Sequence, residues 1–180
     1  MLPNDQGRRL RRMRLLRQMK QSHLAELMDV DQATVSRWER GILDFSEAQW
    51  VVACQLLTAP FGSAQDAWLK RLVESSTQKV HLVCDQTHRL LAASRPRQAE
   101  WRADLSMFLG KSLLVYASPE ILAADTALDD LGWHDGRVGS LEVVTGPNRD
   151  EDLTILPGRV LWERIMLADG TPARLATTIA

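Results

Sequence analysis

The stretch QATVSRWERG, residues 32–41, combines small, polar, cationic and aromatic side chains in an order that suits one short amphipathic helix. Asp31 precedes it as a plausible N-cap, and Gly41 stands where glycine commonly ends a helix. Val35 and Trp38 are three residues apart and therefore share one face. The other positions are mostly small or polar. The stretch predicts a helix with a buried apolar face and an outward polar face.

The spacing of apolar side chains predicts four helices before residue 60, at residues 8–19, 21–28, 32–40 and 46–57, the last opened by a capping box. A tight turn joins the second and third helices. Two helices joined in this way form a helix-turn-helix unit, whose second helix can lie in the major groove of DNA. Gln32 and Ala33 would then face base edges, and Ser36 and Arg37, one turn further on, would reach bases or phosphates.

Residues 10–58 resemble the Cro/repressor (XRE-type) helix-turn-helix family. The matching positions are Leu10, Met13, Arg14, Gln21, Leu24 to Leu27 and Thr34 to Gly41. By this resemblance Gln32, Ala33 and Arg37 are base-reading positions, and Gln21, Thr34 and Arg40 are placed for phosphate contacts. The predicted DNA-binding residues are Gln21, Asp31, Gln32, Ala33, Thr34, Ser36, Arg37 and Arg40.

The resemblance also implies a structural ion pair between Arg14 and Glu39. Two residues depart from the family pattern. Asp29 stands where the turn glycine is usual, so a non-glycine residue is expected in a left-handed conformation at some cost. Lys20 stands where a Ser or Thr cap is usual. These departures predict a domain of modest stability.

Charge is unevenly distributed along the chain. The net charge is −1, but residues 1–45 contain nine Arg or Lys against six Asp or Glu, which leaves +3 there and −4 in the remainder. The Arg-rich face of residues 8–17 is open to two interpretations, a solvated helix surface or a source of phosphate contacts. The overall charge argues against a protein that coats nucleic acid.

Beyond residue 63 the pattern changes from helix to sheet. A connector helix is expected within residues 61–78, with Trp68, Leu69, Leu72 and Val73 as its apolar positions. Two strands are expected at 79–85 and 89–94, helices at 96–131, and three strands at 138–146, 158–167 and 171–179. Asp169-Gly170 marks a hairpin between the last two strands. The domains expected are therefore residues 1–60, 61–78 and 79–180.

This order of elements in residues 79–180 is similar to that of a PAS-type sensor domain, and VLWERIMLADGTPARL resembles the closing strand pair of that family. Ser94 occupies a position that is often Asn in the family, and a generic α+β domain remains the alternative. The fold class expected is α+β: an N-terminal all-α helix-turn-helix bundle followed by a PAS-like antiparallel sheet domain with flanking helices.

No cofactor is predicted, and the cofactor-binding residues are left unknown. The flavin-binding motif GxNCRFLQ is absent, His134 is the single candidate for an axial haem ligand in the helical segment, and the histidines show no metal-ligand spacing. If a cavity exists, the candidates to line it are Leu82, Leu141, Val143, Trp162 and Leu175, although each also suits plain core. Cys54 and Cys84 are interpreted as small buried side chains.

The leading hypothesis is a cytoplasmic, sequence-specific DNA-binding transcriptional regulator that binds a palindromic operator as a homodimer. Its C-terminal domain is expected to be a sensor or dimerisation domain, at which a small-molecule or protein signal could act. The alternative is a protein-interaction module, an antitoxin or adaptor, whose DNA binding is autoregulatory. No catalytic constellation, metal set or apolar run long enough to span a membrane is found, so neither an enzyme nor a membrane protein is expected.

Overall fold

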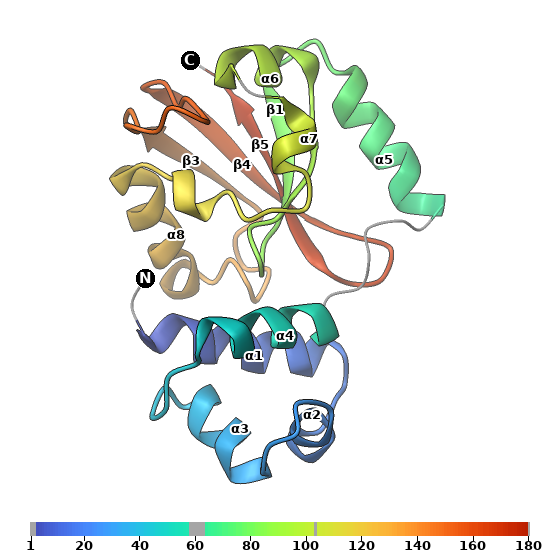
Figure 1. The fold of residues 1–180 in the computed structure, drawn as a ribbon. Coiled ribbons are helices and arrows are strands. Elements are labelled where there is room, and N and C mark those ends of the chain that lie inside the picture. Colours follow the sequence, from blue (N-terminus) through green and yellow to red (C-terminus); the bar gives the residue numbers. More distant parts are fainter. Residues whose placement is uncertain (1–2, 58–63, 103, 180) are drawn as a thin grey trace. The chain divides into compact units, whose positions relative to one another are not determined.

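The structure is a computed structural model, and it describes residues 3–57, 64–102 and 104–179. Contacts divide the chain into two compact units, Met1–Pro60 and Phe61–Ala180 (Figure 1). The break expected at residues 59–63 lies outside the described residues.

The described part of the first unit contains four helices, α1 (Pro3–Leu16), α2 (Gln21–Leu27), α3 (Gln32–Glu39) and α4 (Glu47–Leu57). All four agree with the sequence prediction. The bounds differ most at α1, which begins before residue 8 and ends at Leu16, because Gln18 has a φ of 51° and turns the chain out of the helix.

The predicted caps are confirmed. The backbone N–H of Thr34 donates to Asp31 Oδ1 at 2.6 Å, so Asp31 satisfies one of the open donors at the start of α3. The capping box of α4 is reciprocal. Gln49 N donates to Ser46 Oγ at 3.2 Å, and Ser46 N donates to Gln49 Oε1 at 2.9 Å. These local bonds fix where each helix begins.

The core of the first unit is a cluster of apolar side chains from all four helices, comprising Leu10, Met13, Leu24, Ala25, Val35, Trp38, Ala53, Cys54 and Leu57. Trp38 stacks on Phe45 with ring centroids 4.5 Å apart. The backbone of α1 passes very close to the last turn of α3 at Gly7. A Cβ at this position would overlap the carbonyl oxygen of Trp38. Glycine is therefore required there by close backbone approach, not by φ.

The described part of the second unit contains one helix, two strands, a helical segment and three further strands, in the order that the sequence predicts for a PAS-like domain. Its elements are α5 (Ala64–Ser75), β1 (Val80–Cys84), β2 (Leu90–Ala93), α6 (Arg95–Trp101), α7 (Leu105–Phe108), the 3-10 helix η1 (Leu114–Tyr116), α8 (Pro119–Leu131), β3 (Ser140–Thr145), β4 (Gly158–Met166) and β5 (Pro172–Thr178). The described chain is therefore α+β, as expected.

The strands form one antiparallel sheet in the order β2-β1-β5-β4-β3. The first and last strands of the unit, β1 and β5, are thus neighbours in its middle, with Leu82 opposite Leu175. The hairpin predicted at Asp169-Gly170 is confirmed. Gly170 has a φ of 81°, and Leu167 N donates to the Thr171 carbonyl at 2.9 Å.

Helices cover both faces of this sheet (Figure 1). On one face, Val73 of α5 packs in a cluster with Val80, Leu82 and Ala173 of the strands. On the other face, α6, α7 and α8 contribute to two further clusters, one around Trp101 and one around Trp133 and Trp162. The helix expected as a connector therefore packs as part of the second unit.

Ser94 links the start of α6 to the start of β1. Its hydroxyl donates to the Gln78 carbonyl at 2.6 Å and accepts from the backbone N–H groups of Val80 and Arg97, each at 3.2 Å. The serine that replaces the usual family residue is fully buried and caps α6. It therefore holds the first strand against the helix that follows the second.

The close approach at Gly7 generates a stability prediction. Gly7→Ala should lower the free energy of unfolding of the first unit by about 1–3 kcal/mol, because the added methyl overpacks a backbone contact. In an open helix the same change would stabilise by up to about 1 kcal/mol. Urea unfolding followed by circular dichroism would measure it, with Arg11→Ala at an exposed position of α1 as the control. A stabilised Gly7→Ala variant would contradict this packing.

Candidate nucleic-acid interface and internal cavity

The outward face of α3 carries the side chains that the sequence predicts as base readers. Gln32, Ala33 and Arg37 are exposed, whereas Val35 and Trp38 on the opposite face are buried. One short helix thus separates a polar surface from the core of its own unit. The predicted DNA contacts of these three residues stay predictions, and the structure places them together on one accessible face.

Arg37 is held along the surface of its own helix. Its Nε donates to the Ala33 carbonyl at 3.3 Å and its Nη2 to Thr34 Oγ1 at 3.1 Å, and Asp31 Oδ1 lies 4.0 Å from Nη2. The side chain remains 46% exposed. Exposed bonds of this kind contribute little stability, so the guanidinium is available to a stronger acceptor at small cost.

The back of α3 is fixed by a buried ion pair. Arg14 Nε donates to Glu39 Oε1 at 2.6 Å and Arg14 Nη2 to Glu39 Oε2 at 3.0 Å, while Nη1 donates to the Met19 carbonyl at 2.6 Å. Hydrogen bonds to Glu39 and its charge raise the pKa of Arg14 in spite of burial. The pair implied by the family resemblance is confirmed, and it joins α1 to α3.

Gln21 belongs to the same cluster. Its Nε2 donates to Glu39 Oε2 at 2.8 Å, so the amide of the first residue of α2 also orients the end of α3. Its phosphate contact stays a prediction. Lys20 makes no capping bond at the start of α2, and Asp29 has a φ of 53°, which confirms both departures from the family pattern.

The remaining polar residues of this face lie within α3 and at its C-terminal end. Ser36 and Thr34 are half-buried, and the exposed Arg40 donates from Nε to the Ser36 carbonyl at 3.1 Å. On α1, Arg9 is buried and Arg8 and Arg11 are exposed. The arginines of the first helix therefore divide between core and surface.

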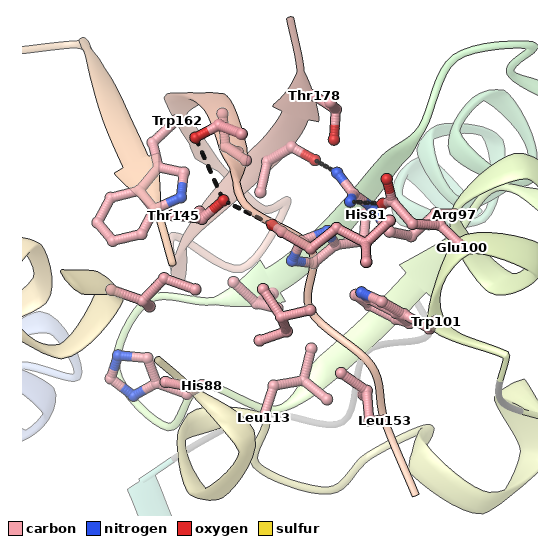
Figure 2. Close-up of a pocket in the computed structure, with 18 of the residues that line it drawn as sticks. His81, His88, Arg97, Glu100, Trp101, Leu113, Thr145, Leu153, Trp162 and Thr178 are labelled. Atoms are coloured by element: carbon pink, nitrogen blue, oxygen red, sulfur yellow. Dashed lines mark hydrogen bonds and ion pairs between the residues drawn. The ribbon is translucent and has the colours of Figure 1, made fainter. Parts of the chain in front are cut away.

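The second unit encloses a cavity between the sheet and its helices (Figure 2). Its volume is about 120 Å³, and it is partly open to solvent. Most of the lining is apolar, from α6, η1, α8, β4 and the segment before β4. Examples of these apolar lining residues are Trp101, Leu113, Ile121, Leu153 and Trp162.

An ion-pair network forms one wall of the cavity. Arg174 of β5 donates from Nε to Asp85 at 2.5 Å and from Nη2 to Asp125 of α8 at 2.8 Å. Trp133 Nε1 donates to the other oxygen of Asp85 at 2.6 Å, and His88 Nε2 lies 2.9 Å from Asp125 Oδ1. The network joins the end of β1, the β1–β2 turn, α8 and β5.

Burial and neighbouring charges have opposite effects on the pKa values of the groups in this network. Burial alone would raise the pKa of Asp85, but the charge of Arg174 and the hydrogen bonds from Trp133 and Arg174 outweigh it, so the pKa lies below the usual value. Burial would likewise lower the pKa of Arg174, but the charges and hydrogen bonds of the two carboxylates outweigh burial and raise it. The guanidinium also lies over the Trp162 ring, 4.2 Å from its centroid.

The opposite wall carries a second buried arginine. Arg97 of α6 pairs with Glu100 through Nη1 and donates from Nη2 to the Lys79 carbonyl at 2.7 Å, while its Nε is buried with no hydrogen-bond partner among the described residues. Burial lowers the pKa of Arg97, against the effect of Glu100. Each buried arginine of the cavity wall thus has its own carboxylate.

His81 of β1 lies between these two walls. Its ring contacts Trp101 edge to face, with centroids 4.9 Å apart, and Nδ1 is buried with no hydrogen-bond partner among the described residues. Burial lowers the pKa of His81 well below its usual value, and Arg97 and Arg174 lower it further. The imidazole is therefore neutral at pH 7.

The sequence-based prediction of the cavity lining was wrong for most of its residues. Trp162 lines the cavity, but Leu82 and Leu175 pack on the opposite face of the sheet beside α5, and Leu141 and Val143 belong to the cluster around Trp133. Both faces of the sheet are covered, so apolar alternation does not show which face holds the cavity. A better signal was the pair of opposite charges at Asp85, directly after β1, and Arg174, within β5.

His134 does not line the cavity. Its Nε2 lies 3.6 Å from Asp129 Oδ1 at the end of α8. Across residues 3–57, 64–102 and 104–179, no cluster of His, Cys, Asp or Glu is arranged to hold a metal ion. Within the same ranges, no helix has the length and apolar character needed to cross a membrane. Cys54 and Cys84 are both buried.

Residues 6–68 match a family model described as a helix-turn-helix domain, so the chain carries that domain at its N-terminus. The comparison with curated proteins gives no match.

Solved PAS and LOV structures resemble the chain at low identity. The PAS domain of an HTR-like protein from Haloarcula marismortui is 18% identical, with a TM-score of 0.41 over 63% of this chain and 94% of that chain. A LOV protein of Rhodobacter sphaeroides is 19% identical, with a TM-score of 0.48 over 65% and 67%. A Desulfitobacterium hafniense PAS domain is 14% identical, with a TM-score of 0.42 over 60% and 96%.

The buried pair behind α3 generates the prediction for this site. Glu39→Gln should destabilise the first unit by about 3–5 kcal/mol, because it leaves the buried guanidinium of Arg14 without a countercharge. Chemical unfolding monitored by circular dichroism would measure the change. Glu47→Gln, at an exposed position of α4, is the matched control and should fall within about 0.5 kcal/mol of the parent. Equal stability of both variants would show that the pair does not hold α3.

Proposed function

We propose that the chain is a sequence-specific DNA-binding transcriptional regulator. The observation that carries the proposal is the outward face of α3 in a helix-turn-helix domain, where Gln32, Ala33 and Arg37 are exposed together. Gln suits hydrogen bonding to adenine, and Arg suits bidentate bonding to guanine O6 and N7 in the major groove. The buried pair of Arg14 and Glu39 keeps this face at a fixed orientation.

Charge supports the same proposal. The basic excess of residues 1–45 lies in the unit that carries α3, and the exposed Arg8, Arg11 and Arg40 contribute to it. Phosphate contacts by such side chains position a protein on the duplex but do not discriminate between sequences. Specificity would therefore rest on α3.

A homodimer on a palindromic operator is the second part of the proposal. One short recognition helix contacts few base pairs, whereas two linked copies add their specific free energies and require correctly spaced half-sites. On α5, Trp68 is 51% exposed and Leu72 is 56% exposed. Exposed apolar side chains of this size on one helix suit contact with a second copy.

The second unit would provide the signal input. Its cavity reaches β1, β4, β5 and α8, and the network of Arg174 connects the end of β1, α8 and β5 directly. A ligand that binds one arrangement of the network better than another would shift the population of the two arrangements. The unit that contains the cavity also contains α5, the proposed contact between copies, which supports coupling between the two.

Genome-wide binding by the wild type beside Arg37→Ala tests the proposal. The wild type should enrich a defined motif, and Arg37→Ala should lose about 1–3 kcal/mol of discrimination at one base pair of each half-site, roughly 5- to 150-fold, because a bidentate contact is removed. Arg11→Ala is the matched control, since loss of an exposed cation on α1 should weaken binding evenly across sequences.

The outcomes separate the proposal from simple electrostatic binding. Identical motifs and discrimination for the wild type and Arg37→Ala would remove Arg37 from base reading. Absence of any enriched motif for the wild type would overturn the proposed function.

A further inference from the structure

The charges that face the cavity of the second unit balance one another. Its lining includes two guanidinium groups, of Arg97 and Arg174, and two carboxylates, of Glu100 and Asp125. Arg97 pairs with Glu100, and Arg174 pairs with Asp125 and with Asp85 behind it. A charged ligand would enter a partly apolar space in which each ionic group already has a countercharge. No new ion pair would then offset the free-energy cost of removing the ligand's charge from water.

The rest of the lining favours an apolar body. Figure 2 shows Trp101 and Trp162 on opposite sides of His81, with Leu113 and Leu153 nearby. Flat aromatic rings have favourable offset and edge-to-face contacts with tryptophan, and the surrounding leucine and isoleucine side chains exclude water.

His81 is an uncharged polar group of this wall that its own unit does not satisfy. Its Nδ1 is buried and has no hydrogen-bond partner among the described residues. A neutral imidazole offers one N–H donor and one acceptor nitrogen, and which nitrogen carries the proton depends on the partner. A buried polar group without a partner is unfavourable, so a ligand that supplies one gains selectivity at this point.

We propose that the cavity binds an uncharged, mainly aromatic small molecule with a single hydrogen-bonding group, and that His81 selects for that group. The inference rests on the proposed function only in taking the second unit as the site of signal input. It assigns the chemical class of the signal and the residue that distinguishes it.

Calorimetric titration of the full chain with three probes of one ring system tests this inference. 2-Naphthol carries a hydroxyl group, naphthalene carries no polar group, and 2-naphthoate carries a charge. We expect 2-naphthol to bind, and 2-naphthoate to bind at least about tenfold more weakly because its charge finds no free countercharge in the wall.

The His81→Phe variant isolates the role of the imidazole. Phenylalanine keeps a ring against Trp101 but forms no such hydrogen bond, so the ratio of naphthalene Kd to 2-naphthol Kd should fall about fivefold to tenfold relative to wild type. Val144→Ala, on the outer surface of β3, should leave all three constants unchanged. Circular dichroism checks that each variant is folded.

A second variant keeps the inference testable if His81→Phe does not fold. Ala117→Phe places a ring in the cavity lining and should weaken 2-naphthol binding at least tenfold. Failure of the wild type to bind 2-naphthol, tighter binding of 2-naphthoate, an unchanged ratio in His81→Phe or unchanged binding by Ala117→Phe would each overturn the inference.

These titrations contain no DNA, so their outcome is independent of the proposed regulator function. A chain that binds 2-naphthol through His81 but enriches no DNA motif would retain this inference and lose the proposed function. A chain that enriches a motif but binds none of the probes would retain the function and lose the inference.

Discussion

A buried guanidinium group has to be met by a carboxylate, and this constraint organises both units of the chain. In the first unit Arg14 pairs with Glu39, and in the second Arg174 pairs with Asp85 and Asp125. Removing one partner from a buried pair leaves a charge without compensation, which is far more costly than losing a pair at the surface. Each pair therefore fixes the relative positions of elements that are distant in sequence.

In the first unit the constraint determines which face of α3 is available. Glu39 lies at the end of the helix and points to Arg14 and Gln21, so Arg37, two residues earlier, lies on a different side. Trp38 fills the core, and Gly7 lets the backbone of α1 reach it. The same packing that stabilises the bundle thus exposes the polar face proposed to bind DNA.

Local signals predicted the helical unit well because they depend on residues close in sequence. The N-cap at Asp31 and the capping box at Ser46 are examples, and the pair of Arg14 and Glu39 followed from a dense family pattern. The cavity was not predictable in the same way. Arg174 meets Asp85 only because β1 and β5 are neighbours in the sheet, and strand order is not encoded in any single strand.

In the second unit the same constraint leaves one polar ring without a partner. The carboxylates of the cavity wall are committed to Arg97 and Arg174, and His81 is neutral between the two guanidinium groups. The wall therefore combines balanced charges, aromatic surface and one unsatisfied imidazole. The residues that give the wall these properties are brought together by the strand order of the sheet and by the helices that cover one face of the sheet.

In the proposed function, α3 reads bases in the major groove through the side chain of Arg37. Methylation of guanine N7 in a bound duplex removes the acceptor that a bidentate arginine requires, without changing the phosphates. Methylation at one guanine of each half-site should therefore block binding by the wild type and have no further effect on Arg37→Ala. Binding that is insensitive to N7 methylation at every guanine of the enriched motif would contradict it.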